Sequence, residues 1–203
     1  MKNEQFLRET FINNTIHLVT EGGFENATTR NIVGDRKEIN DIKLNEGHIY
    51  RIFGTKEQLF AEAFYALDKE VIESINEGCA HIDDEMPFKE KCNTIFTYLW
   101  ELLLRDKKKC RYYTRYYYSC YFKDEVRKQH SRMFDFFIND ITPYFVINAN
   151  VRALFNHVLS TLLNFAVCVY NGAIENNEDT RKHVFFVAYA SIVPYIRSEA
   201  KGE

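Results

Sequence analysis

Cysteine, histidine and carboxylate side chains are the groups in this chain whose types could bind a metal ion or act as catalysts. The five cysteines and six histidines are widely spread, without a C-x-x-C pair or other metal-site spacing. The Cys79-x-His81 pair is too short and isolated to form a metal site. No Ser–His–Asp order, paired carboxylates in an apolar run or phosphate-binding loop is visible. We therefore expect no catalytic residues, no metal and no cofactor, and the chain is not predicted to be an enzyme.

Tyrosines are concentrated in the segment 112–122 (YYTRYYYSCYF), which holds six of the 13 tyrosines. At helical spacing they fall on two neighbouring faces, one with Tyr113, Tyr117 and Tyr121 and the other with Tyr112, Tyr116 and Cys120. Aromatic residues at this spacing usually form packed core, yet each buried hydroxyl needs a hydrogen-bond partner. The pattern therefore leaves three alternatives open: a core, an amphipathic cavity or a dimer surface.

Charge is nearly balanced along the chain. It has 26 Lys and Arg against 29 Asp and Glu, a net charge of −3, which excludes a histone-like polycation. One segment is locally basic, because Arg105–Arg115 contains six basic residues and one acid, Asp106. A solvated turn between helices is the favoured interpretation of this run, and an anion site or a second DNA contact is the alternative.

The composition favours an all-α fold of long helices. Forty-six per cent of residues are hydrophobic, and only 3 Pro and 8 Gly interrupt the chain. Apolar residues recur three and four apart, and no long stretch alternates with period two. Gly22-Gly23 should end the first helix, and Pro143 and Pro194 should kink or end theirs. We expect about nine helices, near residues 4–21, 28–33, 45–52, 56–76, 88–106, 109–122, 124–146, 150–172 and 178–197.

The predicted helices fall into two zones. Residues 1–55 contain short helices with tight breaks, and residues 56–203 contain long amphipathic helices with an aromatic interior. The N-terminal residues are charged, and the apolar stretch 184–196 is shorter than the roughly 20 residues of a membrane span. We therefore expect a cytoplasmic protein of two domains, 1–55 and 56–203, that does not engage a membrane.

The strongest pattern of the first zone is a set of residues in fixed order. Gly23-Phe24, Ala27-Thr28 and residues 30–33 precede the segment 45–60, which reads NEGHIYRIFGTKEQLF. This order resembles the N-terminal domain of the TetR/AcrR family of bacterial transcription regulators. That family's pattern ends in Ser-x-Gly-x-Ile-Tyr-x-Tyr-Phe-x-x-Lys-Glu-x-Leu, of which seven residues are kept here in register. The match covers about residues 6–60 and implies a three-helix, helix-turn-helix DNA-binding domain.

The resemblance also implies which side chains would meet double-stranded DNA. Tyr50 and Lys56 would contact phosphates, and Gly47 would let the recognition helix approach the backbone closely. Ile49 and Phe53 would pack this helix onto the first one. The full set of expected DNA-binding residues is Thr28, Arg30, Asn45, Gly47, His48, Tyr50 and Lys56. The Thr28 hydroxyl should also cap the helix that begins there.

Three features depart from the family pattern. About six residues are inserted near 37–42, Ile52 replaces the usual Tyr or His, and residues 1–56 carry eight basic and eight acidic side chains. Because phosphate neutralisation supplies most non-specific affinity, we expect weak non-specific binding and reliance on dimerisation. We also expect the insertion to lengthen the second helix or the turn after it, displacing the recognition helix.

Family members bind a small effector in the C-terminal bundle and dimerise through their last two helices. By position, the effector-lining candidates are Phe96, Trp100, Tyr113, Tyr117, Phe134, Phe137 and Phe165. The dimer candidates on the two apolar last helices are Leu154, Val158, Leu162, Phe185, Ala188 and Ile192.

The function expected from the resemblance is that of a homodimeric regulator, most often a repressor, on a palindromic operator. A small apolar or aromatic effector would change its operator affinity. The alternative is a helical ligand-binding or interaction protein that has kept the fold and lost operator binding.

Overall fold

The computed structural model describes residues 2–34, 38–39 and 42–201, and the chain forms two compact units. The first unit comprises the chain up to Leu67 together with Arg111–Arg127. The second comprises Asp68–Cys110 and the chain from Lys128 onward. The long helix α4 (Lys56–Cys79) contributes to both units. The predicted functional boundary after residue 55 therefore stays a prediction, and it differs from the boundary between the two compact units.

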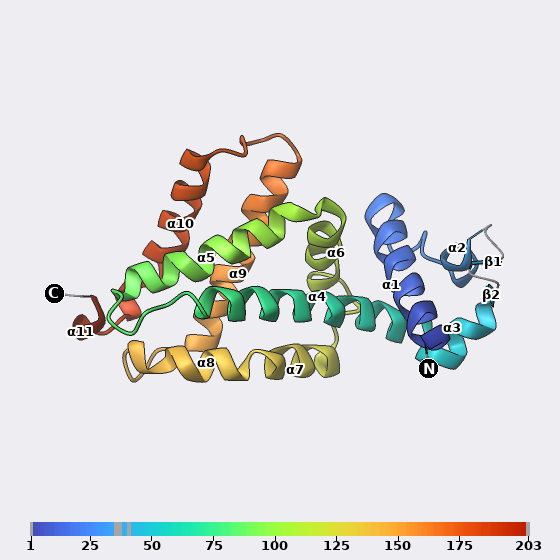
Figure 1. Ribbon diagram of the computed structural model, residues 1–203, viewed down its shortest axis with the longest axis horizontal. Helices are drawn as coiled ribbons and strands as arrows, with labels where there is room; N and C mark the ends of the chain where they lie inside the picture. The colour runs from blue at the N-terminus through green and yellow to red at the C-terminus, as the bar shows by residue number, and fades with distance from the viewer. Residues whose placement is uncertain (1, 35–37, 40–41, 202–203) are drawn as a thin grey trace. The chain divides into compact units, whose positions relative to one another are not determined.

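The first unit begins with one long helix and two short ones. They are α1 (Lys2–Gly22), α2 (Thr29–Val33) and α3 (Glu46–Phe53), and α1 packs against both others (Figure 1). The predicted stop at Gly22-Gly23 is confirmed, because Gly23 has a φ of 81°, which an L side chain rarely adopts. Asn14 Nδ2 donates to the Ile32 carbonyl at 2.8 Å, which joins α1 to α2.

The inserted segment lies between α2 and α3. Two strands of two residues each, β1 (Glu38–Ile39) and β2 (Ile42–Lys43), pair there in antiparallel fashion. Because α2 ends at Val33, the insertion lengthens the connection after the second helix, which is the second of the two expected alternatives, and not the helix itself. Lys37 and residues 40 and 41 lie outside the described residues.

The tyrosine segment belongs to the core of the first unit. Tyr112, Tyr113 and Tyr116 on α6 (Lys107–Tyr117) are buried, and Phe64 stacks on the last two at centroid distances of 4.7 and 4.8 Å. Tyr112 Oη donates to the Phe60 carbonyl at 2.8 Å and Tyr116 Oη to the Tyr121 carbonyl at 3.2 Å. Backbone carbonyls thus satisfy two phenols, and the core alternative holds for these three residues.

The second unit is a bundle of longer helices. Within it, α5 (Phe88–Arg105) packs against both α9 (Val151–Tyr170) and α10 (Glu178–Ile192), which also pack on each other (Figure 1). The remaining helices are α7 (Asp124–Met133), α8 (Asp135–Ile141), α11 (Ser198–Lys201) and the 3-10 turns Thr142–Tyr144 and Val193–Tyr195. The described residues therefore form an all-α fold apart from the short β1–β2 ladder.

Both prolines end their helices, as predicted. Pro143 and Pro194 lie in the two 3-10 turns that follow α8 and α10. The segments after these turns pair, because Val146 N donates to the Tyr195 carbonyl at 2.8 Å and Arg197 N to the Tyr144 carbonyl at 3.0 Å. The expected continuous helices over 124–146 and 178–197 are therefore interrupted, and the one over 109–122 stops at Tyr117.

A buried polar pair joins α4 to α7 inside the second unit. His130 Nδ1 lies 2.9 Å from both carboxylate oxygens of Asp68, and both side chains are almost completely shielded from solvent. His130 also meets the Phe134 ring edge to face. Since a buried charge is costly without a partner, this pair fixes how α7 packs on α4.

The basic run Arg105–Arg115 is bonded within the protein. Lys109 pairs with Glu70 at 2.6 Å, Lys107 Nζ donates to the Tyr170 carbonyl at 3.0 Å, and Arg115 donates to the Val19 carbonyl. The run from Lys107 onward belongs to helix α6, so the expected inter-helix turn is limited to the break at Asp106 between α5 and α6.

Candidate nucleic-acid interface and ligand cavity

The α2–α3 pair is held by side-chain caps. The Thr28 hydroxyl accepts from Asn31 N at 3.1 Å and caps α2, as predicted. Asn45 Oδ1 accepts from His48 N at 3.2 Å and caps α3. The Thr29 hydroxyl donates to the Glu46 carboxylate, which ties the two helices together at their N-terminal ends.

Helix α3 has one buried and one exposed face. Ile49 and Phe53 are buried, and the Phe53 ring meets the Phe11 ring of α1 edge to face at 6.4 Å, as expected. Tyr50 is 51% exposed, and its hydroxyl makes no hydrogen bond to any described residue. Asn45, Gly47 and Arg51 are also exposed. The free face therefore offers a phenol, an amide and a guanidinium to a partner.

The remaining predicted DNA-binding residues differ in how freely they are presented. Arg30 on α2 is exposed, whereas His48 and Lys56 are half-buried. His48 Nδ1 is buried without a hydrogen-bond partner among the described residues, so this ring turns partly inward. A Cβ on Gly47 would lie 3.0 Å from Asn45 Oδ1, so glycine here also makes room for the cap of α3.

The end of α3 is anchored by Arg8 of α1. Its guanidinium lies 5.0 Å over the Phe53 ring, pairs with Glu62 of α4 at 3.2 Å and donates to the Ile52 carbonyl at 3.4 Å. Cation–π contacts of this kind are worth about 0.5–1 kcal/mol at partly exposed sites. One side chain therefore links α1, α3 and the start of α4.

Helix α4 begins with an N-terminal turn that Thr55 caps. The Thr55 hydroxyl accepts from Gln58 N at 3.0 Å, and Lys56 Nζ lies 5.5 Å over the Phe60 ring. Free backbone N–H groups at such a turn attract anions. Sequence reasoning missed Thr55, although Thr-x-x-Gln is a capping-box pattern, and it missed Arg51 and the Thr29–Glu46 bond, which no spacing rule indicates.

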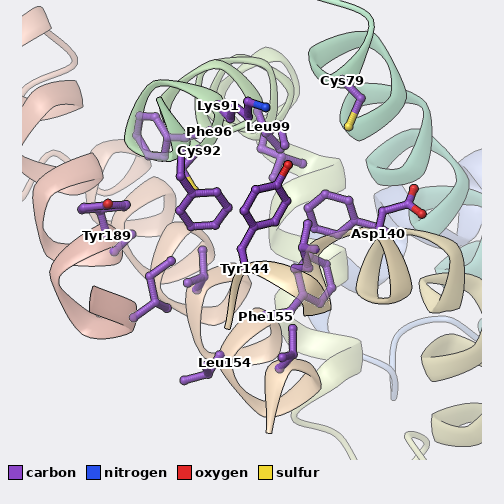
Figure 2. A pocket seen from close by; sticks show the side chains of 18 of the residues that line it. Cys79, Lys91, Cys92, Phe96, Leu99, Asp140, Tyr144, Leu154, Phe155 and Tyr189 are labelled. Carbon is purple, nitrogen blue, oxygen red and sulfur yellow. The ribbon is translucent and has the colours of Figure 1, made fainter. Parts of the chain in front are cut away.

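The second unit contains a cavity of about 420 Å³, a size suited to small organic ligands. Its wall is formed by α4, α5, α8, α9 and α10 and is dominated by apolar and aromatic side chains (Figure 2). The polar side chains on the wall are Asp84, Lys91, Asp140, Tyr144 and Tyr189, together with the thiols of Cys79 and Cys92.

The cavity thiols are poor nucleophiles. Burial raises the pKa of Cys92 to about 12, and burial together with the nearby Asp140 carboxylate raises the pKa of Cys79. No group of His, Cys, Asp and Glu in the described part of the chain could hold a metal ion. The arrangement is therefore suited to binding, and it offers no catalytic pair.

Two of the seven predicted ligand-lining residues, Phe96 and Phe137, lie on the cavity wall. Trp100 and Phe134 are buried beside it, where Trp100 stacks on Phe96 and Phe134 packs on Phe155. Phe165 is half-buried against His183 instead. Tyr113 and Tyr117 belong to the first unit and do not line this cavity.

The six predicted dimer residues all line this cavity. Leu162, Ala188 and Ile192 are only 0%, 3% and 8% exposed, so they face inward and their assignment to a dimer surface is wrong. The helical period was predicted correctly. A helix that is apolar around most of its circumference does not indicate which of its faces packs inside its own unit. The outward stripe instead includes Phe186, which is 66% exposed.

Helix α9 is long and apolar enough to cross a membrane by length and composition, and it is the only such helix in the described residues. Only 28% of its apolar window is buried inside the protein. A core helix of a bundle passes the same test, and α9 packs on α5, α8 and α10.

Several solved structures have the same fold over almost the whole length of the chain. A TetR family transcription regulator from Marinobacter aquaeolei VT8 is similar over 94% of this chain and 98% of its own, with a TM-score of 0.76 and 16% identity. A TetR-family transcriptional regulator from Haemophilus influenzae RD covers the same shares, with a TM-score of 0.69 and 16% identity. No protein-family profile and no curated protein sequence matches the chain. The chain thus has the fold of TetR-family transcription regulators, as its N-terminal motif indicated.

Proposed function

We propose that the protein is a homodimeric, DNA-binding transcription regulator, a repressor whose operator affinity changes when a small apolar or aromatic effector fills the cavity. The observation that carries this proposal is the capped α2–α3 pair. Its free face presents Tyr50 and Arg51 in a chain with the fold of transcription regulators. In a helix-turn-helix unit, this face of the second helix enters the major groove.

The phosphate contacts would come from the edges of the unit. Tyr50 Oη is an unused donor, and the N-terminal turn of α4 adds backbone N–H groups beside the Lys56 ammonium. Arg30 is the exposed cation of α2. Since residues 1–56 carry no net charge, one unit alone should bind weakly, and two recognition helices about 34 Å apart are needed for a tight complex.

The dimer is proposed to form through the outward faces of α9 and α10. The support is the low buried share of α9 and the exposure of Phe186 on α10. Phe186→Glu should place a charge in this interface and yield monomers in sedimentation velocity. Tyr118→Glu, an equally exposed aromatic position in the first unit, should leave the dimer intact.

The coupling mechanism is a population shift. An effector that binds one conformation of the bundle more tightly moves α4, which carries the start of the DNA-binding surface at Lys56. The separation of the two recognition helices then changes and operator affinity falls. A ligand that occupies the cavity without altering operator affinity would exclude this mechanism.

The DNA-binding claim is tested by removing two phosphate contacts. The double variant Tyr50→Phe, Lys56→Ala should bind a selected duplex more weakly, with the slope of log K against log[salt] smaller by about 1–2. The matched control Tyr118→Phe, Lys123→Ala removes the same groups from exposed positions of the same unit and should change neither quantity. Equal losses in the two variants would contradict the proposed contacts.

A ligand-binding or interaction protein without operator binding is the second candidate. The balanced charge of the N-terminal zone and the inserted β1–β2 ladder favour it. This function predicts a dimer that binds ligands in the cavity and shows no preference among DNA sequences.

A further inference from the structure

The cavity of the second unit has its strongest polar groups on one side. Lys91 Nζ donates to the Asp84 backbone carbonyl at 2.9 Å and lies 5.8 Å over the Tyr144 ring. Figure 2 shows the Lys91 ammonium and the Tyr144 hydroxyl toward the same end, with Leu154 at the opposite end. The cavity is therefore amphipathic, with a polar mouth and an apolar interior.

The groups that this mouth offers to a ligand are hydrogen-bond donors. An ammonium has three N–H donors, and the contact with Asp84 occupies one of them. The hydroxyls of Tyr144 and Tyr189 make no hydrogen bond to a described residue, and burial raises the pKa of Tyr189, which keeps it protonated. A ligand that brings acceptors to this end would satisfy the ammonium and the Tyr144 hydroxyl, whereas Tyr189 lies apart from both on α10.

The wall also carries two acidic residues, Asp84 and Asp140. The carboxylate of Asp140 points toward the α4 side in Figure 2, where Cys79 lies. Asp84 is exposed, and its contact with Lys91 is made through the backbone carbonyl. Lys91 is the one basic side chain among the described residues that line the cavity. Lys91 therefore supplies the one cationic group that a ligand can meet beside Tyr144.

The interior accepts only an apolar body. Phe155, Leu162 and Ala188 line the cavity and are buried, and Phe88 stacks on Tyr144 at 4.6 Å. A charged group placed among them would lose its hydration without gaining a partner. An acceptable ligand must keep its charge at the mouth.

We propose that the effector is an amphiphilic carboxylate, with its apolar body in the cavity and its carboxylate bound by Lys91 and Tyr144. This assignment rests on the proposed function only in treating the cavity as the effector site. The Lys91–carboxylate contact is a charge-assisted hydrogen bond, so its removal should weaken binding about 10- to 100-fold. The Tyr144 contact should account for a smaller change of several fold.

Head-group preference is measured on the purified full chain without DNA. The probes are dodecanoate, dodecanol and dodecyltrimethylammonium, and in parallel naphthylacetate, naphthylethanol and naphthylethylammonium, so that both linear and aromatic bodies are represented. The single tryptophan, Trp100, stacks on the lining residue Phe96 and provides the fluorescence signal. In at least one series the carboxylate should bind about tenfold tighter than the alcohol, and the cation weakest.

Variants identify the group that is responsible. Lys91→Met should remove the preference for the carboxylate and leave the affinity for the alcohol unchanged, and Tyr144→Phe should lower the carboxylate affinity alone. Lys69→Met removes a charge from an exposed position of the same unit and should have no effect. Helical circular dichroism of each variant verifies that it is folded.

Equal affinity for the three head groups, tightest binding of the cation, or no binding in either series would each overturn the assignment. So would a carboxylate preference that survives Lys91→Met. A selected operator in a protein without carboxylate preference would refute this inference alone. Carboxylate binding without any enriched duplex would refute the regulator function alone.

Discussion

The two units use the same kinds of side chain for opposite purposes. In the first, Phe64 is sandwiched by tyrosine rings, and the phenols of Tyr112 and Tyr116 bond to backbone carbonyls. In the second, Tyr144 and Tyr189 stand in a cavity wall with their hydroxyls unused. What separates core from binding site is therefore the partner of each hydroxyl, and aromatic content alone does not distinguish them.

This difference has an energetic consequence. When a side chain in a filled core is shortened, packing contacts and buried apolar area are lost. A filled core also has no room for a larger side chain. A cavity wall already lacks part of those contacts and can accept added atoms. The units should therefore respond unequally to the same substitution.

The largest effect is expected from Phe64→Ala. This ring is fully buried between two tyrosines, so its loss should lower the free energy of unfolding by about 3–5 kcal/mol. Phe185→Ala on the cavity wall should lower it less, because that side chain is only half-buried. Urea denaturation followed by circular dichroism measures both, and equal losses would remove the contrast between the units.

The Asp68–His130 pair should give the next largest effect. Asp68→Ala leaves His130 buried without its carboxylate and should cost about 3 kcal/mol. Asp84→Ala, at an exposed position of the same unit, should stay within about 0.5 kcal/mol of the parent protein. A loss below about 1 kcal/mol for Asp68→Ala would show that the pair does little for packing.

Enlarging a small residue tests the contrast directly. Ala63 is buried in the filled unit, and Ala63→Leu should cost about 1–3 kcal/mol through overpacking. Ala188 lines the cavity, so Ala188→Leu should cost less than about 1 kcal/mol while weakening probe binding. The reverse order of stability losses, measured by urea denaturation, would mean that the cavity is already filled.

The smallest effect is expected from Tyr112→Phe, which deprives the Phe60 carbonyl of its donor and should cost about 1 kcal/mol. Burial raises the pKa of Tyr112, so the stability that its neutral form provides is complete below pH about 10 and is lost as pH rises further. Alkaline denaturation should therefore be shallower in the variant. Tyr118→Phe, an exposed position, should leave the profile unchanged.

The sequence predicted the helices well where their ends carry local signals. Thr28 as a cap, Gly23 as a stop and the two prolines after their helices follow from backbone geometry. The β1–β2 ladder escaped prediction because two-residue strands have no detectable period.

The sites were harder to predict because they depend on which elements meet. Ile49 and Phe53 were assigned correctly to the buried face of α3, since this short helix has a single apolar face. Leu162 and Ala188 were misplaced because α9 and α10 are apolar on more than one stripe. Lys91 was not considered, since its role as the mouth cation arises only from its position beside Tyr144.

Selection of duplexes from a random pool by the purified protein tests the central claim most directly. The account predicts a palindromic consensus, with half-sites about one helical turn apart and an affinity that falls steeply with salt. The Tyr50→Phe, Lys56→Ala variant should enrich that consensus poorly. A folded, dimeric protein that enriches no sequence would contradict the account and leave the ligand-binding cavity as its function.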